Sequence, residues 1–223
     1  MNHTFDLVMF DLDGTLIETA PEICDAVNDT LARFDPPAVT QQQVNDWIGH
    51  GTRELLISAL AAAGKTDVAA VRASNSLALI AAEFDRHYQR RCGTRSHLYP
   101  RVRETLVALR LHGVKLAVVT NKEARYTDTV LQVHQLTPLF DRVVSGDTLA
   151  RKKPDPMGID SCLTAFATPA HRALFVGDSS IDVATARNAG VRVWALPYGY
   201  NMGQPISASE PDRLIADCSA LLS

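Results

Sequence analysis

The sequence predicts an α/β fold, a doubly wound parallel sheet that carries an inserted all-helical cap domain. Short apolar runs, typical of strands buried on both faces, alternate with segments of helical periodicity along most of the chain. Between the first run and the second lies a long stretch with helical periodicity only. Alternation of strand and helix favours a Rossmann-like core, a parallel sheet covered on both faces, and the helical stretch is then an insertion.

The strands of this sheet are expected at five apolar runs. The first, Leu7-Val8-Met9-Phe10, stops at a polar segment that contains Gly14. Helices are expected over about 103–111 and in a segment that runs through Val130. Another is expected in an Ala-rich segment that ends at Gly190, a C-terminal stop signal. The other strands are expected at residues 116–119, 143–144, 173–176 and 191–196.

The insertion follows the first strand. Apolar residues from Ile23 to Phe34 recur at steps of three and four, and Pro36-Pro37 ends that helix. Thr40-x-x-Gln43 is a capping box that predicts the next helix start. We therefore predict a core domain of residues 1–16 and 97–223, and a helical cap of residues 17–96 over the ligand-binding end of the sheet.

Bulk properties indicate a metabolic enzyme of the cytoplasm. The chain has 223 residues and a formal charge of −3 without a basic stripe, so no nucleic-acid partner is expected. No apolar run approaches the ~20 residues of a spanning helix, and no secretory signal is evident, so no membrane partner is expected. Four scattered cysteines favour reduced thiols. Monomer and homodimer both remain open.

Polar residues follow the apolar runs where parallel strands would end. Carboxyl ends of strands meet at one edge of an open α/β sheet, where ligands bind. Two acids there repel each other unless a cation or a proton lies between them. Each of these polar segments alone is typical of a turn. Together, and in this order along the chain, they predict a phosphoryl-transfer site. Its candidate residues are Asp11, Asp13, Thr120, Asn121, Lys153, Asp178 and Asp182.

In this order the residues resemble the haloacid dehalogenase superfamily, over nearly the whole chain. Its hydrolases show Asp-x-Asp-Gly-Thr, a Ser or Thr after a strand, a Lys, and Gly-Asp-x-x-x-Asp. Within the superfamily the chain is most similar to phosphoglycolate phosphatases. The matching segments are residues 119–122, 153–156 and 175–179, and the more discriminating Tyr198-Gly199-Tyr200-Asn201.

The resemblance implies a Mg²⁺-dependent hydrolase that forms an aspartyl-phosphate. Asp11 is then the nucleophile, and Asp13 is the general acid and then the general base. Mg²⁺ is held by Asp11, the backbone carbonyl of Asp13, and Asp178. The remaining residues support this chemistry. Thr120, the Asn121 backbone N–H and Lys153 neutralise phosphate charge, and Asp182 holds Lys153 or a metal-bound water.

Substrate selection is expected in the cap, for a small phosphorylated metabolite such as 2-phosphoglycolate. In the segment from Gly49 through His50 and Gly51 to Arg53, glycines expose backbone N–H groups and Arg53 can pair with a carboxylate. The resembled family usually has Gly-Asn-Gly where His50 stands here, which leaves the substrate open.

Other functions stay open at this stage. A phosphosugar phosphatase or mutase, or a pyrophosphatase, would show the same four motifs of the superfamily. These are the Asp-x-Asp-Gly-Thr segment, the Ser or Thr, the Lys and the Gly-Asp-x-x-x-Asp segment. A receiver-like phosphoacceptor domain without turnover would share an acidic pair, a Thr and a Lys, but would not carry the helical insertion. Relatives that cleave carbon–halogen bonds, or phosphonates, lack the second acid that Asp13 supplies here.

Overall fold

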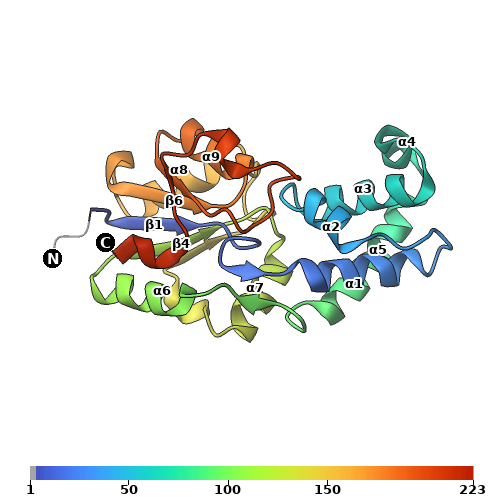
Figure 1. The fold of residues 1–223 in the computed structure, drawn as a ribbon, viewed down its shortest axis with the longest axis horizontal. Helices are drawn as coiled ribbons and strands as arrows, with labels where there is room; N and C mark the ends of the chain where they lie inside the picture. The colour runs from blue at the N-terminus through green and yellow to red at the C-terminus, as the bar shows by residue number, and fades with distance from the viewer. Residues whose placement is uncertain (1–3, 223) are drawn as a thin grey trace.

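The computed structural model describes residues 4–222. Within that range it has two parts, a parallel sheet between helices and a block of helices beside it (Figure 1). The sheet has the strand order β5-β4-β1-β6-β7-β8, and every pairing in it is parallel. Its strands are β1 (Leu7–Phe10), β4 (Lys115–Val119), β5 (Arg142–Val144), β6 (Ala173–Gly177), β7 (Arg192–Ala195) and β8 (Arg213–Leu214).

Both faces of the sheet are covered, which confirms the predicted doubly wound fold. Val8 and Phe10 of β1 face one hydrophobic cluster, whereas Leu7 and Met9 face another. All four are fully buried, so the strand is a continuous apolar run. On the first face lie α6 (Val102–Leu111) and α7 (Ala124–Val133), and on the second α8 (Met157–Ala165) and α9 (Ser180–Asn188) (Figure 1).

The helical insert, defined here as α1–α5, leaves the core after β1. A short antiparallel pair joins the two parts, with Ile17 of β2 (Ile17–Glu18) opposite Leu98 of β3 (His97–Leu98). The predicted capping box is confirmed, because Thr40 and Gln43 exchange both hydrogen bonds. The insert comprises α1 (Ala20–Leu31), α2 (Gln41–Trp47), α3 (Thr52–Gly64), α4 (Val68–Ala73) and α5 (Leu77–Arg91).

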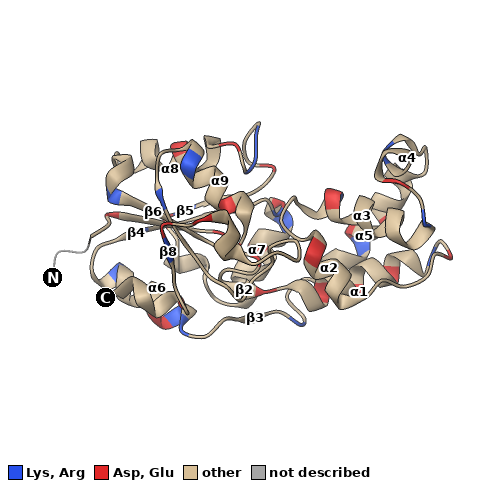
Figure 2. Ribbon diagram, turned by 45° about the horizontal axis from the view of Figure 1, so that its top comes forward, with Lys and Arg blue, Asp and Glu red and all other residues tan. Residues whose placement is uncertain are grey.

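Charge is mixed over the whole chain. Lysine and arginine are interspersed with aspartate and glutamate on both parts of the ribbon (Figure 2). Within residues 4–222, none of the helices is both long enough and apolar enough to cross a bilayer.

Candidate active site

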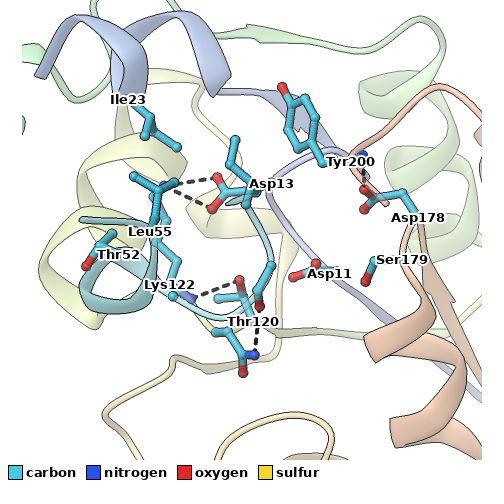
Figure 3. A pocket seen from close by; sticks show the side chains of 14 residues that line it. Asp11, Asp13, Ile23, Thr52, Leu55, Thr120, Lys122, Asp178, Ser179 and Tyr200 are labelled. Carbon is cyan, nitrogen blue, oxygen red and sulfur yellow. Dashed lines mark hydrogen bonds and ion pairs between the residues drawn. The ribbon is translucent and has the colours of Figure 1, made fainter. Parts of the chain in front are cut away.

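The site lies at the carboxyl ends of the three central strands. β1 pairs with β4 on one side and with β6 on the other, and in register Phe10 is opposite both Val118 and Val176. The residues that follow these strands therefore meet at one edge of the sheet. Asp11, Thr120 and Asp178 all line the same cavity (Figure 3).

Three buried carboxylates converge there around one lysine. Asp11, Asp178 and Asp182 each offer an oxygen within 4.8 Å of the others. The Lys153 Nζ forms an ion pair with Asp11 Oδ1 at 2.8 Å and donates a hydrogen bond to Asp182 Oδ1 at 2.7 Å. The predicted partnership of Asp182 with Lys153 is present in the geometry.

Asp182 also organises the start of α9. Its Oδ2 accepts from the Asp178 N–H at 3.1 Å, the Ser179 N–H at 3.0 Å and the Ser179 hydroxyl at 2.8 Å. Gly177 is needed beside it, since a Cβ there would lie 2.4 Å from the Asp182 side chain. Asp182 thus anchors both Lys153 and the backbone at the start of α9.

Asp178 is held in place by residues from both ends of the chain. The Thr15 hydroxyl donates to its Oδ1 at 2.5 Å, and the Tyr200 N–H donates to its Oδ2 at 2.6 Å. A Cβ on Gly14 would lie 2.3 Å from that carboxylate, and one on Gly199 would lie 2.2 Å from it. The segment that follows β7, which sequence analysis valued only as a family signature, therefore shapes the acidic cluster.

The electrostatics of this cluster favour a cation. Burial raises the pKa of Asp11 to about 6, although Lys153 opposes the shift. Burial, and then the charges of Asp182 and Asp11, raise the pKa of Asp178 well above its ordinary value. Carboxylate oxygens are the ligands that Mg²⁺ prefers, and a divalent ion would offset this repulsion. The Asp11 and Asp178 side chains thus fit a site for a divalent cation.

Asp13 belongs to a second ion pair. Its carboxylate accepts from Lys122 Nζ at 2.9 and 3.0 Å, and from the Thr19 hydroxyl at 2.7 Å. The side chain of Asp13 is not in the three-carboxylate cluster, so only its backbone carbonyl is left as the predicted metal ligand. Sequence analysis gave Lys122 no role. Its signal was available, because Lys122 directly follows Thr120-Asn121 at the end of β4.

Asn121 connects the core to the helical insert. Its side-chain N–H₂ donates to the Gly49 carbonyl at 2.9 Å and to the Lys153 carbonyl at 3.0 Å. On the core side, the backbone of Asn121 passes close to Gly146, where a Cβ would lie 2.2 Å from its carbonyl oxygen. Asn121 therefore lies between the insert and the loop that carries Lys153.

The helical insert supplies the other wall of the cavity, through Gly49, Gly51 and α3 (Figure 3). Thr52 begins α3, is buried, and donates to Glu123 Oε1 of the core at 2.6 Å. His50 and Arg53 are exposed and are not among the lining residues. On a helix that starts at Thr52, the next residue turns away by about 100°. The substrate role predicted for Arg53 thus has no support in this arrangement.

Comparisons with known proteins agree with this geometry. Residues 8–196 match the haloacid dehalogenase-like hydrolase family. The chain is 40% identical over 219 residues to the phosphoglycolate phosphatase of Aliivibrio fischeri, covering 97% of this chain and 95% of that protein. It is 38% identical to that of Vibrio cholerae, covering 97% and 95%.

A solved structure is similar over the same length. A protein described as a predicted phosphoglycolate phosphatase from Haemophilus somnus superimposes with a TM-score of 0.90 at 32% identity, covering 98% of this chain and 97% of that one. A relative at this identity and coverage, together with the family match and the arrangement of strand-end residues, establishes the family. The chain is a member of the haloacid dehalogenase-like hydrolase family.

Proposed function

We propose that the protein hydrolyses 2-phosphoglycolate to glycolate and phosphate, with Mg²⁺ and through an aspartyl-phosphate at Asp11. The observation that carries the proposal is the placement of two ion pairs at one edge of the sheet, Lys153 with Asp11 and Lys122 with Asp13. The first ion pair contains the proposed nucleophile, Asp11, and the second contains the proposed general acid and base, Asp13.

Mg²⁺ would be held by the Asp11 and Asp178 carboxylates and the Asp13 backbone carbonyl, and when bound it screens the phosphate charge. The Asp11 carboxylate attacks phosphorus, and the bond from phosphorus to the glycolate oxygen breaks. Lys153 lies beside Asp11, where it offsets the charge of the phosphoryl oxygens together with Thr120 and the Asn121 N–H.

Asp13 handles the protons. It enters the reaction as the carboxylic acid and gives its proton to the departing glycolate oxygen. The carboxylate that results later takes a proton from the water that attacks the aspartyl-phosphate, which regenerates the acid. That second attack releases phosphate and restores Asp11. The hydroxyl of Thr19 and the ammonium of Lys122 fix the orientation of this carboxylate within the cavity wall.

The substrate assignment rests on the named relatives and on the small size of the cavity. Relatives with 37–40% identity over nearly the full chain are called phosphoglycolate phosphatases. The cavity has a volume of about 30 Å³, comparable to one or two water molecules. This volume is smaller than any phosphate ester, so the insert must open to admit the substrate, and a small ester requires the least opening. A cytoplasmic location agrees with the four cysteines, which are free thiols.

A panel of small phosphate esters, assayed with the purified protein and Mg²⁺, tests the proposal. We expect 2-phosphoglycolate to give the highest kcat/KM, an excess of chelator to remove activity, and Mg²⁺ to restore it. Ca²⁺ should not restore it, because its longer bonds and higher coordination number misplace Asp11. A preference for a phosphosugar or for pyrophosphate would overturn the substrate assignment and leave the phosphatase chemistry standing. Full activity in excess chelator would overturn the metal assignment.

A further inference from the structure

Lys122 is a buried cation whose position is not explained by its partnership with Asp13 alone. Its side chain is fully buried, and among the described residues that line the cavity it is the one cation. Its ammonium donates to both oxygens of Asp13 and, at 2.5 Å, to the hydroxyl of Tyr88 on α5. The core thus places a full positive charge against the insert, at the wall of the substrate cavity.

We propose that Lys122 determines specificity by binding a second anionic group of the substrate, the carboxylate of a small phospho-acid, while the phosphate lies at Asp11. The proposal rests on the function proposed above and names the residue that selects its substrate class.

The charges of the cavity require such a cation. Asp11, Asp13 and Asp178 all line it, so it repels an anion wherever no positive group faces that anion. Lys153 pairs with Asp11 and Asp182 at the phosphate end. A substrate with a second negative group therefore needs a second cation.

The hydrogen bonds of Lys122 leave room for that role. Two of its three protons go to one carboxylate, although one bond would keep the ion pair. Asp13 Oδ1 also accepts from Thr19, so this carboxylate stays anchored if one bond is given up. The N–H group that becomes free can donate a hydrogen bond to a substrate carboxylate. Such a charge-assisted hydrogen bond is stronger where water is excluded.

The distance suits a short molecule. Asp11 and Asp13 are separated by one residue, so their Cα atoms lie at most about 7 Å apart. Lys122 is bonded to Asp13, and Lys153 to Asp11. Two lysines held by carboxylates two residues apart are compatible with a substrate whose phosphate and carboxylate lie a few bonds apart, as in a two-carbon phospho-acid.

Other nearby cations are placed less well. Arg53 is exposed and lies outside the cavity lining. Lys152 is also exposed, and its Nζ donates to the His50 carbonyl at 2.6 Å. These two residues are suited to serve as controls, since removing either one takes away a positive charge close to the site from a side chain that does not line the cavity.

The test compares two esters on one preparation. They are 2-phosphoglycolate and phosphoglycolamide, its amide, which keeps the phosphate but lacks the carboxylate charge. In Lys122→Met we expect kcat/KM for 2-phosphoglycolate to fall about ten- to a hundredfold more than kcat/KM for the amide, the loss of one charge-assisted hydrogen bond. In Arg53→Ala and Lys152→Met the ratio of the two esters should stay at the wild-type value. Tyr88→Phe keeps the charge and should also keep the ratio.

The ratio is independent of the folded fraction, so partial unfolding of Lys122→Met does not affect it. If that variant does not fold at all, Lys122→Gln replaces it, since an amide still donates to Asp13 and Tyr88 without a charge. Equal losses for both esters in either variant would overturn the role of Lys122 while phosphoglycolate turnover by the wild type stood. A wild type that does not favour 2-phosphoglycolate over the amide would overturn the substrate assignment and this proposal together.

Discussion

Asp11 combines deep burial with one cationic neighbour, and this combination makes its replacement informative. In Asp11→Asn, an amide of the same shape cannot form an acyl phosphate, so we expect turnover to be lost while the fold is kept. Lys153 keeps its hydrogen bond to Asp182, which limits the disturbance to the ion pair with Asp11. The measurement is kcat for 2-phosphoglycolate, with the melting temperature as the control for folding. A residual kcat of about a tenth of wild type would contradict the nucleophile assignment.

Gly199 tests the acidic cluster without touching a charged side chain. A Cβ at Gly199 would lie 2.2 Å from Asp178 Oδ2, so Gly199→Ala must displace that carboxylate. We expect the Mg²⁺ concentration for half-maximal activity to rise by about tenfold or more, in line with a displaced metal-ligand partner. Gly64→Ala is the matched control, since a Cβ there meets its nearest neighbour at 3.7 Å. Unchanged Mg²⁺ dependence in Gly199→Ala would remove Asp178 from the metal site.

The residues of the site were predictable to different degrees. Asp11, Thr120 and Asp178 follow apolar runs directly, so local sequence places them at strand ends. The pairing of Lys122 with Tyr88 joins residues 34 positions apart, from the core and the insert, and no local pattern reveals it. Arg53 shows the converse, because its residue type suggested a role whereas its position on α3 leaves it exposed and outside the cavity lining, so that role stays a prediction.

At the scale of single helices, α1 carries an ionisable group in an apolar setting. Glu22 is buried, its Oε2 accepts from the backbone N–H groups of Arg95 and Ser96 at 3.3 and 3.1 Å, and its Oε1 has no hydrogen-bond partner. Burial raises its pKa in the folded protein above the ordinary value, 4.5. Between the unfolded-state and folded-state pKa values of Glu22, the folded state binds more protons than the unfolded state does. The free energy of unfolding therefore falls as pH rises through this range.

Glu22→Gln removes that proton linkage. We expect the free energy of unfolding of the variant, relative to wild type, to increase as pH is raised from about 4 through the range in which Glu22 ionises. Urea unfolding at a series of pH values measures it. Glu54→Gln should show the opposite slope, because a hydrogen bond from Arg72 lowers the pKa of Glu54 on α3. Parallel curves for Glu22→Gln and wild type would show that folding does not raise the pKa of Glu22.

Long elements were predictable and very short ones were not. The expected strands at 116–119 and 173–176 correspond to β4 and β6, because strands buried on both faces leave continuous apolar runs. β2, β3 and β8 each have two residues, too few for any periodicity. Their pairing depends on contacts between segments that the sequence does not place side by side, such as Ile17 with Leu98.

At the scale of the whole molecule, the helical insert is closed onto the core. Asn121 donates to the Gly49 carbonyl, Lys152 to the His50 carbonyl, and Thr52 to Glu123. The remaining cavity of about 30 Å³ is too small for a phosphate ester, so the insert must open to admit one. The division at residues 17–96 stays a prediction from sequence, and the short β2–β3 pair is where we expect the hinge.

Hydrogen exchange measures this motion. Because opening breaks the contacts between insert and core, we expect the amides of residues 48–55 to exchange more slowly when Mg²⁺ and vanadate hold the site closed. The interior strands β1 and β4 provide the control, since their exchange should not respond. Equal exchange of residues 48–55 with and without vanadate would mean that substrate enters by another route.

The antiparallel pairing of β2 with β3 has a consequence for how such proteins can diversify. Ile17 and Leu98 stand opposite each other, so the polypeptide leaves the core and returns to it at neighbouring points. Everything between them is one continuous segment of the polypeptide, and Asp11, Thr120, Lys153 and Asp178 all lie outside it. Exchanging that stretch for another of different length would require compatible geometry only at this pair of strands, and it would change one wall of the cavity around an unchanged set of reacting groups.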